Sequence, residues 1–467
     1  QLAEAFLHAP SAALKQRLLA LGEDADAHVK LQLLYTLGEW NAASAAQLLG
    51  QLLREHAADP YLRAAALSSL TDANIAAVFA RLAPHLGEES MENILRPLVA
   101  SAAHLADAEL QKTVLRAVAG RDETVLPWQL DALAEWLDAT RERDGKVRDV
   151  LSQMPSEAVE GLLETARAWI ADPMATEGQK RYALRLLMTP TVGTEEDLDL
   201  VAELLAPEQT PTIQSYAVSA LERRGDSAAI KRLLAGLDTR APERQAGVLE
   251  ALFRLPEGPA KLLEKIEQGE LPATLLATRK QQRLRNASDS QLAARAEKLF
   301  TAAPDVNRGR VLKAHEHVAG LDGDPRRGKL LFDKQCAACH QLAGVGHAIG
   351  SNLAALRDRT PESLLVAILD PNRAVEPRYL EYQIETLEGR LFTGLILSES
   401  EAYVVLGTAD GKQHRIPRQQ IGELRTNGRS LMPEGLEKEL SPQQLADVIA
   451  FVATGGNLVT HNPPDSG

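Results

Sequence analysis

Apolar residues recur with the spacing of amphipathic helices from residue 1 to about residue 320. Short turns containing Gly, Pro or Asp separate these stretches, and an alternating strand pattern is almost absent. Residues 181–187 resemble residues 215–221, which lie 34 positions later, and residues 244–252 repeat the pattern about thirty positions further on. Paired helices that recur every 30 to 45 residues or so predict an α-solenoid, in which each pair covers the apolar face of its neighbours.

This pattern breaks at residues 319–323, and we place a domain boundary there, between residues 1–320 and 321–467. Asp324 followed by Pro325 is a good N-cap and first-turn pair, so a helix is expected to begin there. Near the chain's end, residues 441–444 (Ser-Pro-Gln-Gln) form a capping-box pattern ahead of an apolar helix that stops before two glycines. We expect the two helices to cross, with Gly328 beneath Phe451.

Between these two helices the apolar period changes from helical to strand-like. Residues 360–370 predict a short helix, and from residue 379 the period is two. Strands are expected at residues 379–387, 391–398, 402–406 and 412–416, with glycine turns between them. The small antiparallel sheet, at about residues 377–427, is expected to shield a site in the flanking segments, to form a docking surface, or only to brace the loop that follows it.

Composition narrows the functional classes. The chain has 467 residues and a formal charge of -13, and 4% of its residues are aromatic. A nucleic-acid surface needs clustered positive charge, so we expect no nucleic-acid partner. No stretch approaches the roughly eighteen consecutive apolar residues of a membrane-spanning helix. A partner steered by charge would carry a positive patch.

The only two cysteines lie in the run Cys336-Ala337-Ala338-Cys339-His340. This C-x-x-C-H spacing is typical of c-type haem attachment. On one helical turn, residues i, i+3 and i+4 share a face, so two thiols can bond the porphyrin while the imidazole reaches the iron. A redox dithiol, a structural zinc site and a buried disulfide are the alternatives. A redox dithiol is expected near a βαβ pattern, and a structural zinc site usually needs a second pair of ligands. The sequence supplies neither.

Met432 is the candidate for the sixth iron position. It is the only methionine after the haem motif and stands before a proline in a predicted loop. A thioether on iron raises the reduction potential. His347, His414 and His461 are rival ligands, and a core-filling role for Met432 is the plain alternative. Arg373, Arg378 and Arg429 are candidates for pairing with haem propionates, although solvated arginines are common.

These segments together resemble a class I cytochrome c. The resemblance rests on Gly328-x-x-x-Phe332, the C-x-x-C-H run, residues 350–353, Met432-Pro433 and the closing helix. Residues 368–373 and 431–436 more narrowly resemble the haem-binding domain of planctomycete and verrucomicrobial proteins, which follows HEAT repeats and often a sugar-dehydrogenase-type propeller. The implied fold is mainly α: a HEAT-like solenoid, then an all-α cytochrome c domain with a β insertion.

The resemblance implies one covalent haem c held by Cys336 and Cys339, with His340 and Met432 as axial ligands. We therefore expect an exported, periplasmic electron-transfer module that passes electrons from a dehydrogenase to a respiratory carrier. No catalytic residue is assigned, and the chain is expected to be a carrier rather than an enzyme on its own, or the C-terminal part of a larger oxidoreductase. The solenoid surface is a possible site for a protein partner. The alternatives are a haem sensor with a labile sixth position and a peroxidase, for which only His347 offers an acid/base group.

Overall fold

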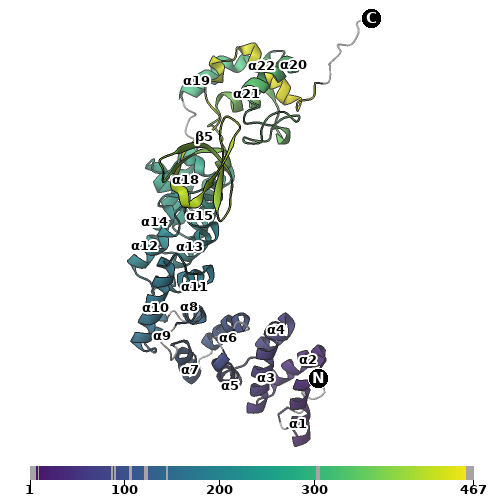
Figure 1. Ribbon diagram of the computed structural model, residues 1–467, viewed down its shortest axis with the longest axis vertical. Coiled ribbons are helices and arrows are strands. Elements are labelled where there is room, and N and C mark those ends of the chain that lie inside the picture. Colours follow the sequence, from purple (N-terminus) through teal and green to yellow (C-terminus); the bar gives the residue numbers. More distant parts are fainter. Residues whose placement is uncertain are drawn as a thin grey trace. The chain divides into compact units, whose positions relative to one another are not determined.

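The computed structural model describes residues 7–8, 10–85, 88, 91–104, 108–119, 125–143, 146–300 and 306–458. Helices dominate these residues, and a five-stranded antiparallel sheet lies near the C-terminal end of the sequence (Figure 1). The chain divides into two compact units, residues 1–201 and residues 202–467. Among the described helices, none combines the length and apolar character needed to cross a membrane.

The first unit is helical throughout its described residues. Its helices are α1 (Ala12–Ala20), α2 (Ala27–Glu39), α3 (Ala43–Glu55), α4 (Pro60–Ser68), α5 (Ile75–Leu82), α6 (Glu92–His104), α7 (Ala108–Ala119), α8 (Pro127–Arg143), α9 (Val147–Leu151), α10 (Ser156–Ala171), α11 (Glu177–Leu187) and the start of α12 (Glu195–Glu203). Helices two apart in sequence pack together, for example α2 with α4, α3 with α5 and α6 with α8. Trp40 and Trp136 are buried in this unit. A HEAT-like solenoid stays a prediction.

The second unit begins with further helices and ends with the predicted haem region. Its helices are α13 (Pro211–Arg224), α14 (Ser227–Leu234), α15 (Pro242–Arg254), α16 (Gly258–Glu267), α17 (Thr278–Arg285), α18 (Ser290–Phe300), α19 (Val306–His315), α20 (Pro325–Gln335), α21 (Pro361–Leu369) and α22 (Pro442–Ala453). The unit also contains short 3₁₀ helices, among them η6 (Ala273–Leu275), η7 (Glu316–Gly320) and η11 (Leu436–Lys438).

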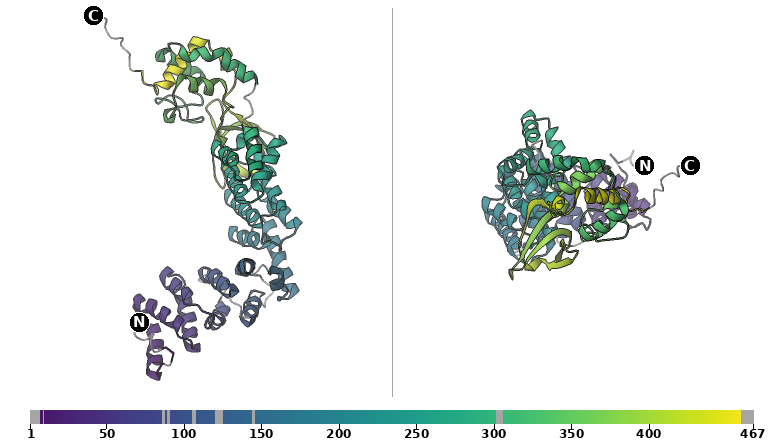
Figure 2. Two further views of the ribbon diagram at one scale, coloured as in Figure 1. Left: turned by 180° about the vertical axis from the view of Figure 1, so that it is seen from behind. Right: turned by 90° about the horizontal axis from the view of Figure 1, so that it is seen from above.

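Helices α20 and α22 pack against each other, as predicted (Figure 2, green and yellow helices). The caps are those expected, because Asp324 accepts a bond from the first turn of α20 and Ser441 and Gln444 form a capping box on α22. A Cβ on Gly328 would stand 1.9 Å from the Asp447 carbonyl oxygen and 3.0 Å from Phe451 Cβ, so only glycine permits this approach. The prediction that Gly328 lies beneath Phe451 is therefore confirmed.

A single apolar cluster joins these helices to their neighbours. Phe332 and Phe451 are fully buried, with their ring centroids 5.3 Å apart. Residues of α21 also belong to the cluster, and so does Val318 of η7. Helix α19 and η7 both pack on α21, although they precede the predicted boundary at residue 320. That boundary stays a prediction.

The sheet contains one more strand than the sequence pattern predicted. The strands are β1 (Leu380–Thr386), β2 (Leu391–Glu399), β3 (Tyr403–Gly407), β4 (Gln413–Pro417) and β5 (Ile421–Ser430), in the order β4-β3-β2-β1-β5. The first four match the predicted strands within a few residues. Strand β5 was missed because register shifts interrupt its pairing with β1 and because Thr426 and Gly428 occupy buried positions where apolar residues would have signalled a strand.

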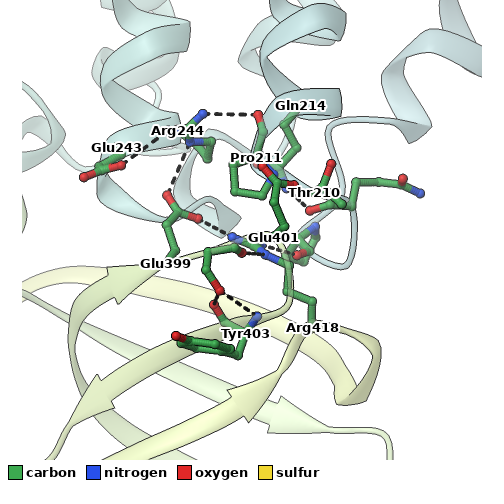
Figure 3. Close-up of polar contacts among 12 residues, drawn as sticks. Thr210, Pro211, Gln214, Glu243, Arg244, Glu399, Glu401, Tyr403 and Arg418 are labelled. Atoms are coloured by element: carbon green, nitrogen blue, oxygen red, sulfur yellow. Dashed lines mark hydrogen bonds and ion pairs between the residues drawn. The ribbon is translucent and has the colours of Figure 1, made fainter. Parts of the chain in front are cut away.

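Buried polar contacts connect the sheet to the helices that precede it in the sequence (Figure 3). Arg418, whose side chain is 4% exposed, donates to the Pro207 carbonyl at 2.8 Å and to Glu399 at 2.6 Å. The other oxygen of Glu399 accepts from Arg244 of α15 at 3.3 Å. At a second point, Thr274 of η6 donates to the Gly428 carbonyl of β5 at 2.6 Å. The sheet therefore contacts the helices through both β2 and β5.

Candidate functional site: the C-x-x-C-H turn

The two cysteines and His340 lie on one helical turn that directly follows α20. The helix ends at Gln335, and the N–H groups of Cys339 and His340 both donate to the Cys336 carbonyl, at 3.1 and 2.9 Å. These bonds continue the helical conformation through the motif. Its residues i, i+3 and i+4 therefore lie on the same face. The arrangement expected from the sequence is thus present at this position.

A backbone carbonyl fixes the orientation of the His340 ring. The ring Nδ1 lies 2.9 Å from the Ser351 carbonyl oxygen. Because a carbonyl can only accept, Nδ1 carries the proton, and the Nε2 lone pair is left for a metal. Burial also lowers the pKa of His340, which favours the neutral imidazole that ligation requires, although the bond to Ser351 acts in the opposite direction.

The loop after the motif wraps closely around the turn. The N–H groups of Ile349 and Gly350 donate to the Cys339 carbonyl at 3.1 and 2.7 Å. A Cβ on Gly350 would stand 2.8 Å from the His340 ring. Gly346 has φ +89° and approaches the His340 carbonyl so closely that a Cβ would be 2.1 Å away. The glycines therefore allow the backbone to pack against the histidine that it orients.

The two thiols lack the lowered pKa of a reactive dithiol. Both are free. Burial raises the pKa of the Cys336 thiol to about 11. Burial, followed by the nearby Asp410 carboxylate, also raises the pKa of Cys339. Redox-active cysteines depend on a lowered pKa, which this environment does not provide. Within the described residues, no group of three or more His, Cys, Asp and Glu side chains is placed to hold a metal ion.

The turn between β3 and β4 covers the second cysteine. The Cys339 thiol donates to the Ala409 carbonyl at 3.6 Å. A Cβ on Gly411, which has φ +82°, would be 2.9 Å from the His347 ring and 3.2 Å from the Ala338 carbonyl. The sequence offers shielding of the site as one role for the insertion but does not identify the residues that would lie there. No local pattern predicts this contact, because the two segments are about 70 positions apart.

Met432 lies in the loop between β5 and α22 and is half-buried. Its N–H donates to the Ser430 hydroxyl at 3.2 Å. Among the rival ligands, His347 packs beside Gly411, and His414 contacts Phe392 with ring centroids 5.0 Å apart. His461 lies outside the described residues. Ligation by Met432 stays a prediction.

Two of the three candidate propionate partners already contact carboxylates. Arg378 pairs with Glu376 at 2.9 Å, and Arg429 pairs with Glu434 at 2.8 Å. Arg373 is exposed, immediately after the segment that ends α21. A role for any of them beside a haem propionate stays a prediction.

Comparison with known proteins agrees with this geometry. A family model described as cytochrome c matches residues 325–382, which run from the first residue of α20 through the C-x-x-C-H turn and α21 into β1. A search of curated proteins found no match to the chain. A cytochrome c domain implies covalently bound haem c, and the two free thiols and the oriented imidazole fit that group. The chain therefore contains a cytochrome c domain, and the C-x-x-C-H turn lies within the matched residues.

Proposed function

We propose that this chain is an electron-transfer cytochrome in which Cys336 and Cys339 hold one haem c covalently, with His340 and Met432 as the axial ligands. The observation that carries the proposal is the bond from His340 Nδ1 to the Ser351 carbonyl, on the same helical turn as two free thiols. That bond leaves Nε2 as the only ring nitrogen able to reach iron.

Haem c supplies one-electron exchange between ferric and ferrous iron. The chain's own residues supply attachment, orientation and exclusion of water. The Phe332 and Phe451 rings form an apolar cluster next to the attachment turn, and Cys336 packs against that cluster. An apolar surrounding and a thioether ligand both favour the ferrous state over the more highly charged ferric state.

The position of the β insertion also supports an electron-transfer cytochrome. Its β3–β4 turn lies on the Cys339 side of the motif, and β5 leads directly into the loop that carries Met432. We propose that the sheet both shields that side of the haem and braces the methionine loop. The helices of residues 1–320 would act as a HEAT-like scaffold or docking arm for a partner.

The proposed setting is the periplasm, or another exported location, with a dehydrogenase as electron donor and a respiratory carrier as acceptor. A formal charge of -13 favours partners that present a positive patch to this chain.

The test of this function is Met432→Ala, with Met174→Ala as the matched control because Met174 is exposed and belongs to the first unit. The Met432 variant is expected to change the ferric absorption spectrum, lower the reduction potential and bind carbon monoxide rapidly once reduced. The control should behave as the unmodified protein. An unchanged spectrum and potential in Met432→Ala, or rapid carbon monoxide binding by the unmodified reduced protein, would contradict the proposal and favour a haem sensor or a peroxidase.

A further inference from the structure

The loop that carries Met432 is held at both ends by side chains from distant segments. Asn372, three residues after α21, accepts a bond from the Ser430 N–H at 2.7 Å. Its amide nitrogen donates to Glu434, which also accepts from Arg429 at 2.8 Å. One asparagine therefore contacts the residues two positions before and two positions after Met432.

A second contact, an ion pair, holds the chain a few residues further along the loop. Arg308 of α19 donates to both carboxylate oxygens of Glu437 in η11, at 2.9 and 3.2 Å. The side chains of this pair are only 9% and 7% exposed, and Arg308 also donates to the Leu369 carbonyl at the end of α21. The bond from Arg308 lowers the pKa of Glu437, so the pair is ionised at neutral pH. Bidentate geometry of this kind is more specific than a simple ion contact.

Both sets of contacts involve the C-terminal end of α21. Leu369 is the last residue of α21, and Asn372 follows in the next turn. Helix α21 packs on α22 and shares its apolar cluster with Phe332 and Cys336. The contacts therefore connect the Met432 loop to the same group of packed helices that carries the C-x-x-C-H turn.

The loop itself has little structure that could hold it without these contacts. Residues 431–435 form neither helix nor strand, and Gly435 has φ +101°. Fixing each residue of such a segment costs conformational entropy. Without these contacts the loop would be free to move. The Met432 sulfur would then spend part of its time away from the iron.

We propose that Asn372 and Arg308 are positioning residues that hold the Met432 loop where its sulfur ligates the iron. This inference rests on the proposed His340 and Met432 ligation. It assigns a role to two side chains that act through the loop, one of which lies in the region predicted to be helical repeat.

The experiment compares Asn372→Ala and Glu437→Gln with Met432→Ala and a matched control. The control is Asn427→Ala, because Asn427 also donates to a carboxylate, that of Glu381 at 3.0 Å, and accepts from a backbone N–H, that of Arg429 at 2.8 Å, but lies within β5. The readouts are the rate of carbon monoxide binding to the reduced haem protein, the ferric absorption spectrum, the reduction potential and hydrogen exchange of residues 431–436.

We expect Asn372→Ala to bind carbon monoxide roughly tenfold faster than the unmodified protein, because two hydrogen bonds to the loop are lost. Its loop amides should exchange faster and its reduction potential should fall, with a smaller change of the same sign in Glu437→Gln. Asn427→Ala should match the unmodified protein.

The outcomes separate this inference from the proposed function. If Met432→Ala changes the spectrum but Asn372→Ala and Glu437→Gln behave as the control, the positioning role is wrong and the ligation stands. A loss of thermal stability in those variants with an unchanged spectrum and carbon monoxide rate would likewise overturn it, since the contacts would then serve the fold alone. If Met432→Ala changes nothing, the ligation itself fails and the inference fails with it.

Discussion

The crossing of α20 and α22 predicts that Gly328→Ala weakens the haem domain. The new Cβ would stand 1.9 Å from the Asp447 carbonyl oxygen, whereas ordinary contact begins at 3.4 Å, so the shortfall is 1.5 Å. The obstacle is backbone, which cannot rotate away, and the helices must therefore separate. Separation would also loosen the contact between Phe332 and Phe451, whose rings are 5.3 Å apart.

Overpacking of this kind costs about 1–3 kcal/mol and occasionally more. The better helix propensity of alanine returns about 0.5–1 kcal/mol of that loss. We expect a net decrease of about 2 kcal/mol in the free energy of unfolding. The control is Gly309→Ala in α19, where a Cβ meets nothing within 4 Å, and this variant should be neutral or slightly stabilised.

The assay is urea unfolding followed at two wavelengths. The Soret band reports the haem domain, and tryptophan fluorescence reports the first unit, because all four tryptophans lie before residue 201. Gly328→Ala should lower the Soret midpoint and leave the fluorescence midpoint unchanged. A Soret midpoint equal to that of Gly309→Ala would refute the reasoning about this helix crossing.

Three further predictions concern buried contacts of the second unit. Phe332→Ala should cost about 3–5 kcal/mol in the same Soret assay, because it empties a fully buried ring site; a cost below about 1 kcal/mol would contradict the packing described. Burial acts to raise the pKa of Asp447, but the bonds from Arg327, the Asp324 N–H and Gln443 together outweigh burial and lower the pKa. This carboxylate therefore stabilises the fold above its ordinary pKa, and the contribution disappears as pH falls through the lowered value. Asp447→Asn should therefore flatten the loss of stability measured below about pH 4, and an unchanged acid profile would count against the pair. Arg418→Met should cost about 3–5 kcal/mol because it leaves Glu399 buried with a weaker partner, and chemical unfolding that shows no loss would refute the role of this contact.

Local signals were enough to predict the elements around the attachment turn. The residue pair Asp324-Pro325 marks the start of α20, and the capping box at Ser441 marks the start of α22. Each of these signals acts within one turn of helix, so it can be read without knowledge of the fold. The same holds for the first four strands, whose alternation is visible in the sequence.

Strand β5 shows where that approach fails. Its buried positions include Thr426 and Gly428, and a larger residue at Gly428 would come within 2.4 Å of Pro272. The tertiary contact selects glycine, and the strand loses its hydrophobic signature as a result.

The contacts that orient the candidate site also lie beyond local patterns. The motif identifies His340, but the Ser351 carbonyl that sets its tautomer belongs to a loop 11 residues away. The Ala409 carbonyl beside Cys339 is 70 residues away, and Arg308 lies 129 residues before Glu437. Residue types and spacing can suggest a cofactor, whereas the partners that position its ligands depend on chain topology.

The most direct test of the account is whether haem stays on the chain after denaturation. The protein is produced in a host competent in cytochrome maturation, together with a Cys336→Ala/Cys339→Ala variant, and both are examined by intact mass and by haem staining of a denaturing gel. The account predicts a mass increase of one haem and a stained band for the unmodified chain, with neither for the variant. Colourless unmodified protein whose two thiols still titrate would contradict it.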